Sequence, residues 1–358
     1  MALSSDSCSS VAVVDLFCGV GGLTKGLANA GLHVVAGIDV DPDCRFPYTA
    51  NNDAEFELAD VSTLKPKSVA ARFPEDSFRV ISGCAPCQPF SRYGRAAVNR
   101  RSQWSLMEDF CRIAVEVRPD VITMENVPEV CHHTVFAEFI DRLRREQYSV
   151  SYANLYCPDY GVAQNRRRLV LLASLHGEIE IPKPTLCPGK YKTVRSVIGG
   201  LPPIAAGEMN EGDRLHRACK LSETNLERLR VSSPGGTWRD WPEHLRATCH
   251  KAESGSTYPS VYGRMEWDAV APTITTQFFG FGNGRFGHPE QDRAISIREG
   301  AMLQSFPKHY RFHSADSKMS VQRLGRLIGN AVPVKLGAAI GRAITKHLKQ
   351  EAGAYETK

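Results

Sequence analysis

Residues 11–22 read VAVVDLFCGVGG, and this stretch decides the fold class. Its apolar beginning is typical of a strand that is buried on both faces of a parallel sheet. The glycines that follow permit a tight turn and a close approach of the backbone to a ligand. Leu23, Leu27 and Ala30 then recur at helical spacing, and Gly31 is a natural helix stop. The stretch therefore predicts a buried strand, a ligand-binding turn and a helix.

A second strand is predicted at residues 33–40, and it ends beside two carboxylates, Asp39 and Asp41. Asp39 lies 20 residues after Gly19, a position from which an acidic side chain can hydrogen-bond the ribose of a nucleoside cofactor. The glycine pattern is G-x-G-G, which differs from the G-x-G-x-x-G of dinucleotide-binding enzymes. The loop therefore suits S-adenosylmethionine as well as a nucleotide. A turn that binds no ligand remains an alternative.

Strands and helices continue to alternate up to about residue 173. Apolar runs predict strands at 56–61, 78–82, 120–124, 150–155 and 169–173, and helical spacing predicts helices at 106–117 and 136–143. This alternation is typical of a doubly wound α/β sheet, whose ligands bind at the carboxyl ends of its strands. Asp60 and Glu125 both fall at such ends and are therefore candidate site residues.

Residues 80–91 read VISGCAPCQPFS and place Cys87 just beyond a predicted strand. Gly83 and two prolines force a turn at this point. A thiol on such a loop is accessible, and nearby N–H groups and basic side chains can favour its thiolate, so it suits a nucleophile. Two alternatives compete. Cys84 and Cys87 have the spacing of a thioredoxin-like redox pair, and free cysteines are often inert core residues.

The composition of the 358-residue chain is that of an ordinary globular protein, with 42% hydrophobic and 23% charged residues. The length suggests two domains or one large one. No apolar run of membrane-spanning length and no secretory signal is evident, so we expect no membrane span and reduced thiols for the eleven cysteines. The net charge of +5 fits a polyanionic partner without requiring one.

The composition changes from about residue 180 to 260, where Pro, Gly, Thr and charged residues dominate with little periodicity. This region predicts a second, irregular domain, followed by short strands and turns at 273–276 and 278–286. A four-residue apolar repeat then predicts a C-terminal helix that packs on the sheet of the first domain. The repeat consists of Val332, Leu336, Ile340, Ile344 and Leu348.

Six motifs together closely resemble the DNA (cytosine-5)-methyltransferase family, in that family's order and across nearly the whole chain. They are Asp15–Gly22, Gly83–Ser91, Glu125-Asn126-Val127, Gln164-x-Arg166-x-Arg168, Arg264–Thr276 and Gly329–Pro333. The thioredoxin hypothesis accounts for Cys84 and Cys87 alone, so the resemblance displaces it. The resemblance implies a Rossmann-like, S-adenosylmethionine-dependent methyltransferase sheet with a smaller, irregular target-recognition domain. We expect the catalytic domain to comprise 1–185 plus 320–358, and the target-recognition domain and hinge to comprise 186–319.

The resemblance also implies a mechanism. Cys87 would attack C6 of a flipped-out cytosine and so activate C5 for methylation. Glu125 would serve N3 as an acid or hydrogen-bond donor, and Arg166 and Arg168 would place positive charge near the cytosine O2, the phosphate and the thiolate. Among the cofactor residues, Phe17 would stack on adenine, Asp39 would bind ribose, Asp60 the adenine amino group and Asn330 the methionine side. The full cofactor set is Phe17, Gly19, Val20, Gly21, Gly22, Asp39, Val40, Asp60, Pro86, Leu106, Asn330 and Ala331. The predicted DNA-binding residues are Gln88, Ser91, Arg92, Arg95, Arg100 and Gln164.

Some features depart from the family pattern or leave alternatives open. Asp39 replaces a frequent Glu, which keeps the carboxylate but shortens its reach. Cys84 is expected to be structural, with a reversible disulfide to Cys87 on oxidation as the alternative. We expect no metal, because the adjacent Cys131-His132-His133 lack the spacing of a zinc site. Base readers cannot be assigned. Trp238, Arg239, Trp241, Arg285 and Phe286 are candidates that would serve equally as packing or phosphate contacts.

The expected partner is double-stranded DNA, methylated by a monomer in the bacterial cytoplasm or nucleoid. A cognate restriction endonuclease would accompany it without forming a stable complex, and no membrane is involved. A tRNA cytosine methyltransferase of the same family is the alternative, although the Cys-Phe-Thr signature usual in that branch does not occur. An inactive DNA-binding protein and a nicotinamide oxidoreductase are the remaining alternatives. The first would not need every catalytic side chain, and the second lacks its glycine fingerprint.

Overall fold

The computed structural model describes residues 10–86, 101–252, 255, 259, 261–314, 317 and 320–356, without the side chains of 101–104 and 352–356. The chain forms two compact units. Unit 1 comprises Met1–Tyr156, Arg167–Pro184 and Val332–Lys358, and unit 2 comprises Cys157–Arg166 and Thr185–Ala331. Residues 157–166, 185 and 320–331, which we had placed with the catalytic domain, thus fall in unit 2. The functional division into catalytic and target-recognition domains stays a prediction.

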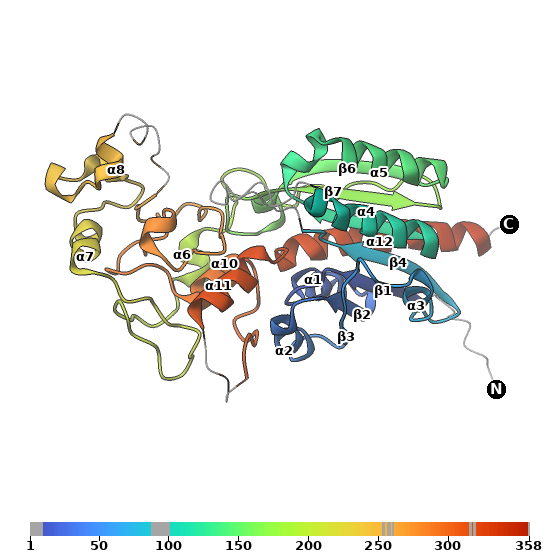
Figure 1. Cartoon of the computed structure of the whole chain (residues 1–358), viewed down its shortest axis with the longest axis horizontal. Helices are drawn as coiled ribbons and strands as arrows, with labels where there is room; N and C mark the ends of the chain where they lie inside the picture. The colour runs from blue at the N-terminus through green and yellow to red at the C-terminus, as the bar shows by residue number, and fades with distance from the viewer. Residues whose placement is uncertain are drawn as a thin grey trace. The chain divides into compact units, whose positions relative to one another are not determined.

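A seven-stranded sheet forms the centre of unit 1 (Figure 1). Its strands are β1 Ser10–Leu16, β2 His33–Asp39, β3 Glu55–Leu58, β4 Ser77–Gly83, β5 Val121–Asn126, β6 Ser149–Tyr156 and β7 Arg167–Ser174. The spatial order is β3-β2-β1-β4-β5-β7-β6. The first five strands are parallel, whereas β7 is antiparallel to both of its neighbours. The predicted doubly wound α/β fold is confirmed, with one antiparallel strand inserted next to the edge of the order 3-2-1-4-5-6.

Helices cover both faces of this sheet. They are α1 Gly22–Asn29, α2 Arg45–Thr49, α3 Pro66–Ala70, α4 Arg101–Val117, α5 Thr134–Arg145 and α12 Val334–Glu356, with the 3-10 turns η1 Pro42–Cys44 and η2 Pro128–His132. On one face, Val14 of β1 shares a core with Phe110 of α4 and Phe139 of α5. On the other face, Ser174 of β7 lies 2.8 Å from the His347 ring of α12. Alternate residues of each strand point to opposite faces, so both helix layers bury apolar side chains of the sheet.

The C-terminal helix α12 packs most extensively on α1, not on the sheet alone as we predicted. The reason is a close approach of the two helices at Gly26. A Cβ atom at this position would lie 2.4 Å from the carbonyl oxygen of Val334 and 2.6 Å from the amide nitrogen of Ala338. The absence of a side chain at Gly26 therefore lets the two backbones meet.

We expect Gly26→Ala to destabilise the protein by about 1–3 kcal/mol, because the new methyl group meets backbone atoms that cannot rotate away. The gain in helix propensity of up to ~1 kcal/mol offsets only part of this cost. Urea unfolding measures the change. Gly200→Ala is the matched control, because nothing lies within 4 Å of a Cβ atom there. Equal stability of the two variants would contradict the close packing of α1 on α12.

One segment of the described chain, Val321–Glu351, is apolar and long enough to pass a membrane-span test by length and composition. The mean hydropathy of its 18-residue window is 1.2, and 72% of that window is buried inside the protein. Pro333 also interrupts it between α11 and α12. Burial of this kind is typical of a core helix, and it agrees with the packing of α12 on α1.

Unit 2 is irregular, as predicted, but it contains more helix than its composition suggested. Its helices are α6 Val194–Ile198, α7 Glu223–Arg230, α8 Thr248–Lys251, α10 Ile297–Leu303 and α11 Val321–Asn330, with the 3-10 turns η3 Cys157–Tyr160, η4 Trp238–Asp240, η5 Glu243–Leu245 and η6 Phe281–Asn283. Of the short strands and turns expected at 273–276 and 278–286, the strands are wrong: residues 273–275 have no regular secondary structure, and turns, bends and η6 follow.

Buried arginines take over part of the role that strand pairing would play in unit 2. The guanidinium of Arg264 donates to four carbonyl oxygens, those of Leu229, Ser232, His288 and Gln291, and pairs with Asp292. Arg293 makes a bidentate pair with the buried Glu299 at 2.7 and 2.8 Å. These guanidinium groups donate hydrogen bonds to backbone carbonyls that have no partner in a β-sheet. An irregular chain can therefore satisfy its buried polar groups.

Candidate active site

The glycine-rich loop after β1 is fastened to the end of β2 through Asp39. The amide of Gly19 donates to Asp39 Oδ2 at 2.8 Å, and the amide of Asp41 donates to Oδ1 at 2.9 Å. Phe17, Gly19 and Gly21 all have positive φ, at 56°, 53° and 83°. Burial raises the pKa of Asp39, although the backbone N–H donors oppose this. The spacing of Gly19 and Asp39 in the sequence thus becomes a direct contact that fixes the loop and orients the carboxylate.

The side chains around Asp39 fit a nucleoside. Val40 is 64% exposed, which is unusual for an apolar residue at the end of a buried strand, and Phe17 is half-buried. Asp60 is exposed two residues beyond β3, where its Oδ1 accepts from the amide of Ser62 at 2.9 Å. An oriented carboxylate next to an exposed apolar side chain is the combination that binds a sugar and a base.

The other predicted cofactor residues are placed as follows. In unit 1, Val20 is buried in the loop, Leu106 is half-buried on α4, and Pro86 is exposed. In unit 2, Asn330 is exposed at the end of α11, and Ala331 is half-buried. Their role in cofactor binding remains a prediction.

A buried polar network beneath the loop was not foreseen. Asp15 is 1% exposed and accepts hydrogen bonds from Thr24 Oγ1 at 2.6 Å and Ser82 Oγ at 2.9 Å. The hydroxyl of Tyr48 lies 3.2 Å from that of Thr24. The network joins β1, β4 and α1. The sequence did contain a signal for this network, namely an aspartate within an apolar strand. A buried carboxylate needs hydrogen-bond donors around it.

Asp15 makes stability depend on pH. Burial raises its pKa from 3.8 to about 6. Between these two values the folded state holds a proton that the unfolded state has released, so the free energy of unfolding falls as pH rises and levels off above about 6. We expect Asp15→Asn, which has no charge to bury, to gain stability relative to the parent protein between pH ~4.5 and ~7.5. Urea unfolding at both pH values tests this, and a pH-independent difference would contradict it.

The carboxylate of Glu125 lies at the carboxyl end of β5 and is held from two sides. Its side chain is 2% exposed. Arg168 Nε of β7 lies 3.0 Å from Oε1, and the thiol of Cys84, just past β4, donates to Oε2 at 3.0 Å. Next to it, Asn126 Nδ2 donates to the carbonyl of Ala85 at 3.1 Å. The structure thus brings together two predicted catalytic residues, Glu125 and Arg168, and adds Cys84.

The loop that we predicted to carry the nucleophile lies outside the part of the chain that the structure describes. Cys87, Gln88, Ser91, Arg92, Arg95 and Arg100 lie outside the described residues. The described chain reaches Pro86, next to Cys87 in sequence. Cys84 and Ala85 are both hydrogen-bonded to residues of β5, so the described segment passes beside Glu125 shortly before it ends at Pro86.

Gln164 and Arg166 belong to unit 2, where they brace a turn. Gln164 is completely buried. Its Oε1 accepts from the amide of Ile274 at 2.9 Å, and its Nε2 donates to Leu303 O at 3.2 Å and to Gln304 Oε1 at 3.0 Å. Arg166 is 4% exposed, and its Nη1 donates to Ile274 O at 3.2 Å. These contacts favour a bracing role for Gln164 over the DNA contact we predicted. The catalytic role of Arg166 stays a prediction.

Gln304 connects two of the sequence motifs within unit 2, and sequence reasoning missed it. Its Nε2 donates to Ile328 O at 3.0 Å, while its Oε1 accepts a hydrogen bond from Gln164 Nε2. A Cβ atom at the neighbouring Gly329 would lie 2.4 Å from the carbonyl oxygen of Thr275. The segments around 164, 275 and 329 therefore form one packed cluster, although they are far apart in sequence.

Three of the five candidate base readers are packing residues. Trp238, Trp241 and Phe286 are each no more than 3% exposed, which leaves them unable to reach a base edge in this structure. Arg285 donates to the carbonyl of Gly235 and is half-buried, whereas Arg239 is exposed. Aromatic side chains in a polar segment look like recognition residues, but here they build the small core that an irregular unit requires.

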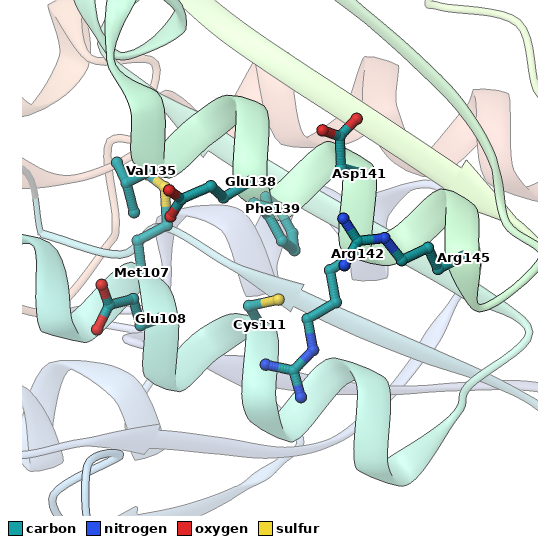
Figure 2. A pocket seen from close by; sticks show the side chains of 9 residues that line it. All are labelled: Met107, Glu108, Cys111, Val135, Glu138, Phe139, Asp141, Arg142 and Arg145. Atoms are coloured by element: carbon teal, nitrogen blue, oxygen red, sulfur yellow. The ribbon is translucent and has the colours of Figure 1, made fainter.

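A cavity of about 390 Å³ lies between α4 and α5, and Figure 2 shows the side chains that line it, among them Met107 and Cys111 from α4 and Phe139 and Arg142 from α5. Acidic and basic groups, among them Glu108, Glu138 and Arg142, surround an apolar floor. Burial raises the pKa of the Cys111 thiol in this floor to about 11, so it is a poor nucleophile. None of the predicted catalytic or cofactor residues that the structure describes lines this cavity. Within the described part of the chain, no group of three or more His, Cys, Asp or Glu side chains suits a metal ion.

The sheet order and the loop that Asp39 holds define a Rossmann-like methyltransferase fold. The chain belongs to the C-5 cytosine-specific DNA methylase family, whose model matches residues 11–346. The family resemblance predicted from six motifs is confirmed.

Individual relatives agree with this membership. The chain is 50% identical to the Type II methylase M.HgiDII of Herpetosiphon aurantiacus, over 94% of this chain and 96% of that protein. It is 32% identical to the Type II methyltransferase M1.HphI of Haemophilus parahaemolyticus, over 95% of this chain and 88% of that protein. Among solved structures, a putative DNA modification methyltransferase encoded within an Escherichia coli prophage superimposes with a TM-score of 0.72 at 22% identity, covering 95% of this chain and all of that one. The last match supports the fold alone.

Proposed function

We propose that this chain is a DNA cytosine-5 methyltransferase of a restriction-modification system, with S-adenosylmethionine as its methyl donor and Cys87 as its covalent nucleophile. The observation that carries the mechanism is the buried Glu125 carboxylate, held by Arg168 and Cys84 beside the strand that leads to Cys87. The carboxylate is 2% exposed and lies between a guanidinium and a thiol, which supports a role for Glu125 at N3 of the cytosine ring.

The residues act on the flipped-out cytosine in sequence. The Cys87 thiolate bonds to C6, and the ring electrons move toward N3, where Glu125 supplies a proton or hydrogen bond. C5 then takes the methyl group that S-adenosylmethionine would supply, and the broken sulfur–methyl bond would leave S-adenosylhomocysteine. Loss of the C5 proton to a base returns the electrons to the ring and expels the Cys87 thiolate. Arg168 keeps Glu125 oriented throughout and adds positive charge beside the ring.

The cofactor site fits S-adenosylmethionine at the residues that can be placed. Asp39 presents a fixed carboxylate for ribose hydroxyls, and the exposed Val40 presents an apolar surface for adenine. S-adenosylmethionine supplies an electrophilic methyl group on a sulfonium, which C5 can attack directly. Phe17 and Asp60 at the same edge of the sheet would complete the adenosine contacts.

We expect Asp39→Ala to weaken S-adenosylmethionine binding by about 10- to 100-fold, because the ribose loses a charged acceptor and Gly19 loses the partner that fixes its loop. Isothermal titration measures this affinity, and a DNA-binding assay should show little change. Asp53→Ala is the matched control, since Asp53 is an exposed carboxylate two residues before β3. An unchanged affinity in Asp39→Ala would remove Asp39 from the ribose site.

Methyl transfer from labelled S-adenosylmethionine to mixed duplex DNA and to tRNA tests the function as a whole. Base-resolution mapping of 5-methylcytosine then identifies the target. Methylation of DNA at one short recurring sequence is the expected result. Methylation of tRNA alone would overturn the assignment and favour the RNA branch, and methylation of neither would favour an inactive DNA-binding protein.

The similarity to Type II methylases also supports the cellular setting. The chain would act as a monomer in the bacterial cytoplasm, beside a cognate restriction endonuclease that cuts the same sequence when it is unmethylated. Sedimentation of the purified protein with a duplex that contains the mapped sequence tests the monomer, and a complex of two chains on one site would contradict it.

A further inference from the structure

The thiol of Cys84 contacts the carboxylate that the proposed mechanism needs, although Cys84 was expected to be structural. Its Sγ donates to Glu125 Oε2 at 3.0 Å. The contact follows from the sheet register. β4 and β5 run parallel with Gly83 opposite Met124, so the next position along each strand sets Cys84 beside Glu125.

The backbone around Cys84 is fixed on both sides. A Cβ atom at Gly83 would lie 2.7 Å from the Phe110 ring and 2.9 Å from the carbonyl of Leu16, so the chain has no room to shift there. On the other side, Asn126 Nδ2 holds the carbonyl of Ala85 at 3.1 Å. The thiol is therefore presented to Glu125 by a rigid segment.

The two oxygens of Glu125 have separate partners that act in different ways. Arg168, whose side chain is 14% exposed, lies against Oε1 at 3.0 Å and donates from Nη1 to the carbonyl of Arg167 at 2.7 Å. Cys84 lies against Oε2. Arg168 pairs with Oε1 through its permanent charge, but Oε1 accepts no hydrogen bond from the described residues, whereas Oε2 accepts one from the thiol. The ion pair attracts the carboxylate, and the hydrogen bond from Cys84 sets the direction of Oε2.

We propose that Cys84 is a positioning residue for methyl transfer, one that holds Oε2 of Glu125 in orientation for the cytosine ring. The proposal rests on the proposed function of Glu125 at N3. A weak donor serves this task because it orients the carboxylate yet opposes protonation less than a hydroxyl would. Among the residues that the structure describes, the charged and titratable groups recorded against Glu125 are Arg168 from β7 and Cys84 from the end of β4.

Two substitutions separate orientation from simple packing. Cys84→Ala removes the donor, and Cys84→Ser replaces it with a stronger one. Cys131→Ala is the matched control, because the thiol of Cys131 is also half-buried and donates at 3.0 Å, but to the backbone carbonyl of Pro128. Single-turnover methyl transfer is measured across pH ~5.5–9.5, together with the affinities for DNA and S-adenosylmethionine.

The pH profiles of the two variants are expected to shift in opposite directions. In Cys84→Ala the maximal rate falls by roughly 5- to 10-fold, and the alkaline limb of the pH profile moves to higher pH, because the protonated carboxyl is no longer opposed by a donor. In Cys84→Ser the rate stays within about 2-fold, and the alkaline limb moves by a few tenths of a pH unit to lower pH. Both affinities and the Cys131→Ala profile stay unchanged.

The outcomes distinguish this proposal from the one it rests on. If Glu125→Gln also retains full activity, the role of Glu125 is wrong. If Glu125→Gln is impaired but both Cys84 variants match the parent profile, the positioning role is wrong. An equal loss of rate in both variants without movement of the pH profile would likewise reduce Cys84 to packing. If Cys84→Ala does not fold, the nearly isosteric Cys84→Ser still decides the proposal, through the expected shift of its alkaline limb to lower pH.

Discussion

Cys87→Ser is expected to abolish methyl transfer, with a loss of at least ~10³-fold, while the protein still binds DNA and S-adenosylmethionine. A serine hydroxyl is not ionised at neutral pH and is a far weaker nucleophile than a thiolate, so the bond to C6 does not form. Affinity persists because the oxygen occupies nearly the same space. Transfer of a labelled methyl group to duplex DNA measures the loss, and a gel-shift assay measures the retained binding.

A duplex that carries 5-fluorocytosine at the mapped target makes the same test without turnover. The parent protein should form a complex that survives denaturation, because the fluorine at C5 cannot leave as a proton does and Cys87 stays bonded to C6. Cys87→Ser should form none, whereas Cys131→Ala should behave as the parent does. Near-normal methyl transfer by Cys87→Ser would exclude the covalent mechanism.

The fold of unit 1 could be predicted because local patterns determine it. The apolar run before residue 17 and the helical spacing after it fix β1 and α1 to within a residue or two. Asp39 was placed at the loop by its distance from Gly19 along the chain, and the hydrogen bond of 2.8 Å between them confirms that the two meet. Parallel strands carry their functional residues to one edge, so a linear sequence suffices to place them.

Unit 2 could not be predicted in this way, because its contacts are non-local and depend on single side chains. Arg264 donates to carbonyl oxygens that lie 24 to 35 residues away along the chain, and no periodicity in the sequence predicts such a contact. For the same reason Trp238 and Trp241 were considered as base readers and proved to be core. The partner of Gln164 is Gln304, 140 residues later, a pairing that one sequence cannot reveal.

In the active site the sequence identified which residues matter but not how they touch. Glu125 and Arg168 come from a motif match, yet their separation of 3.0 Å depends on β7 running antiparallel beside β5. The network of Asp15 with Thr24 and Ser82 escaped notice because a single buried aspartate has no spacing signature. Cys84 was judged by its distance from Cys87 along the chain, and its contact with Glu125 depends on the register of β4 and β5, which the sequence does not show.

Glu125→Gln is expected to lower the single-turnover rate by about 10²- to 10⁴-fold, the range typical of a lost general acid. Glutamine preserves the volume of the buried side chain and can still offer an N–H group to N3, but it cannot transfer a proton as the ring accepts Cys87. The denaturation-resistant complex with 5-fluorocytosine DNA should therefore form slowly rather than not at all, which separates this variant from Cys87→Ser.

The matched control for Glu125→Gln is Glu55→Gln. Glu55 also pairs with an arginine, at 3.2 Å from Arg72, but its side chain is 80% exposed and lies on the outer strand β3. Removal of an exposed ion pair should change stability by less than about 1 kcal/mol and leave the rate of methyl transfer unaltered. A similar loss of rate in both variants would mean that charge on unit 1, and not proton transfer at N3, limits the reaction. A selective loss in Glu125→Gln, with adduct formation slowed to the same extent, would place the acid at the step in which Cys87 bonds to C6.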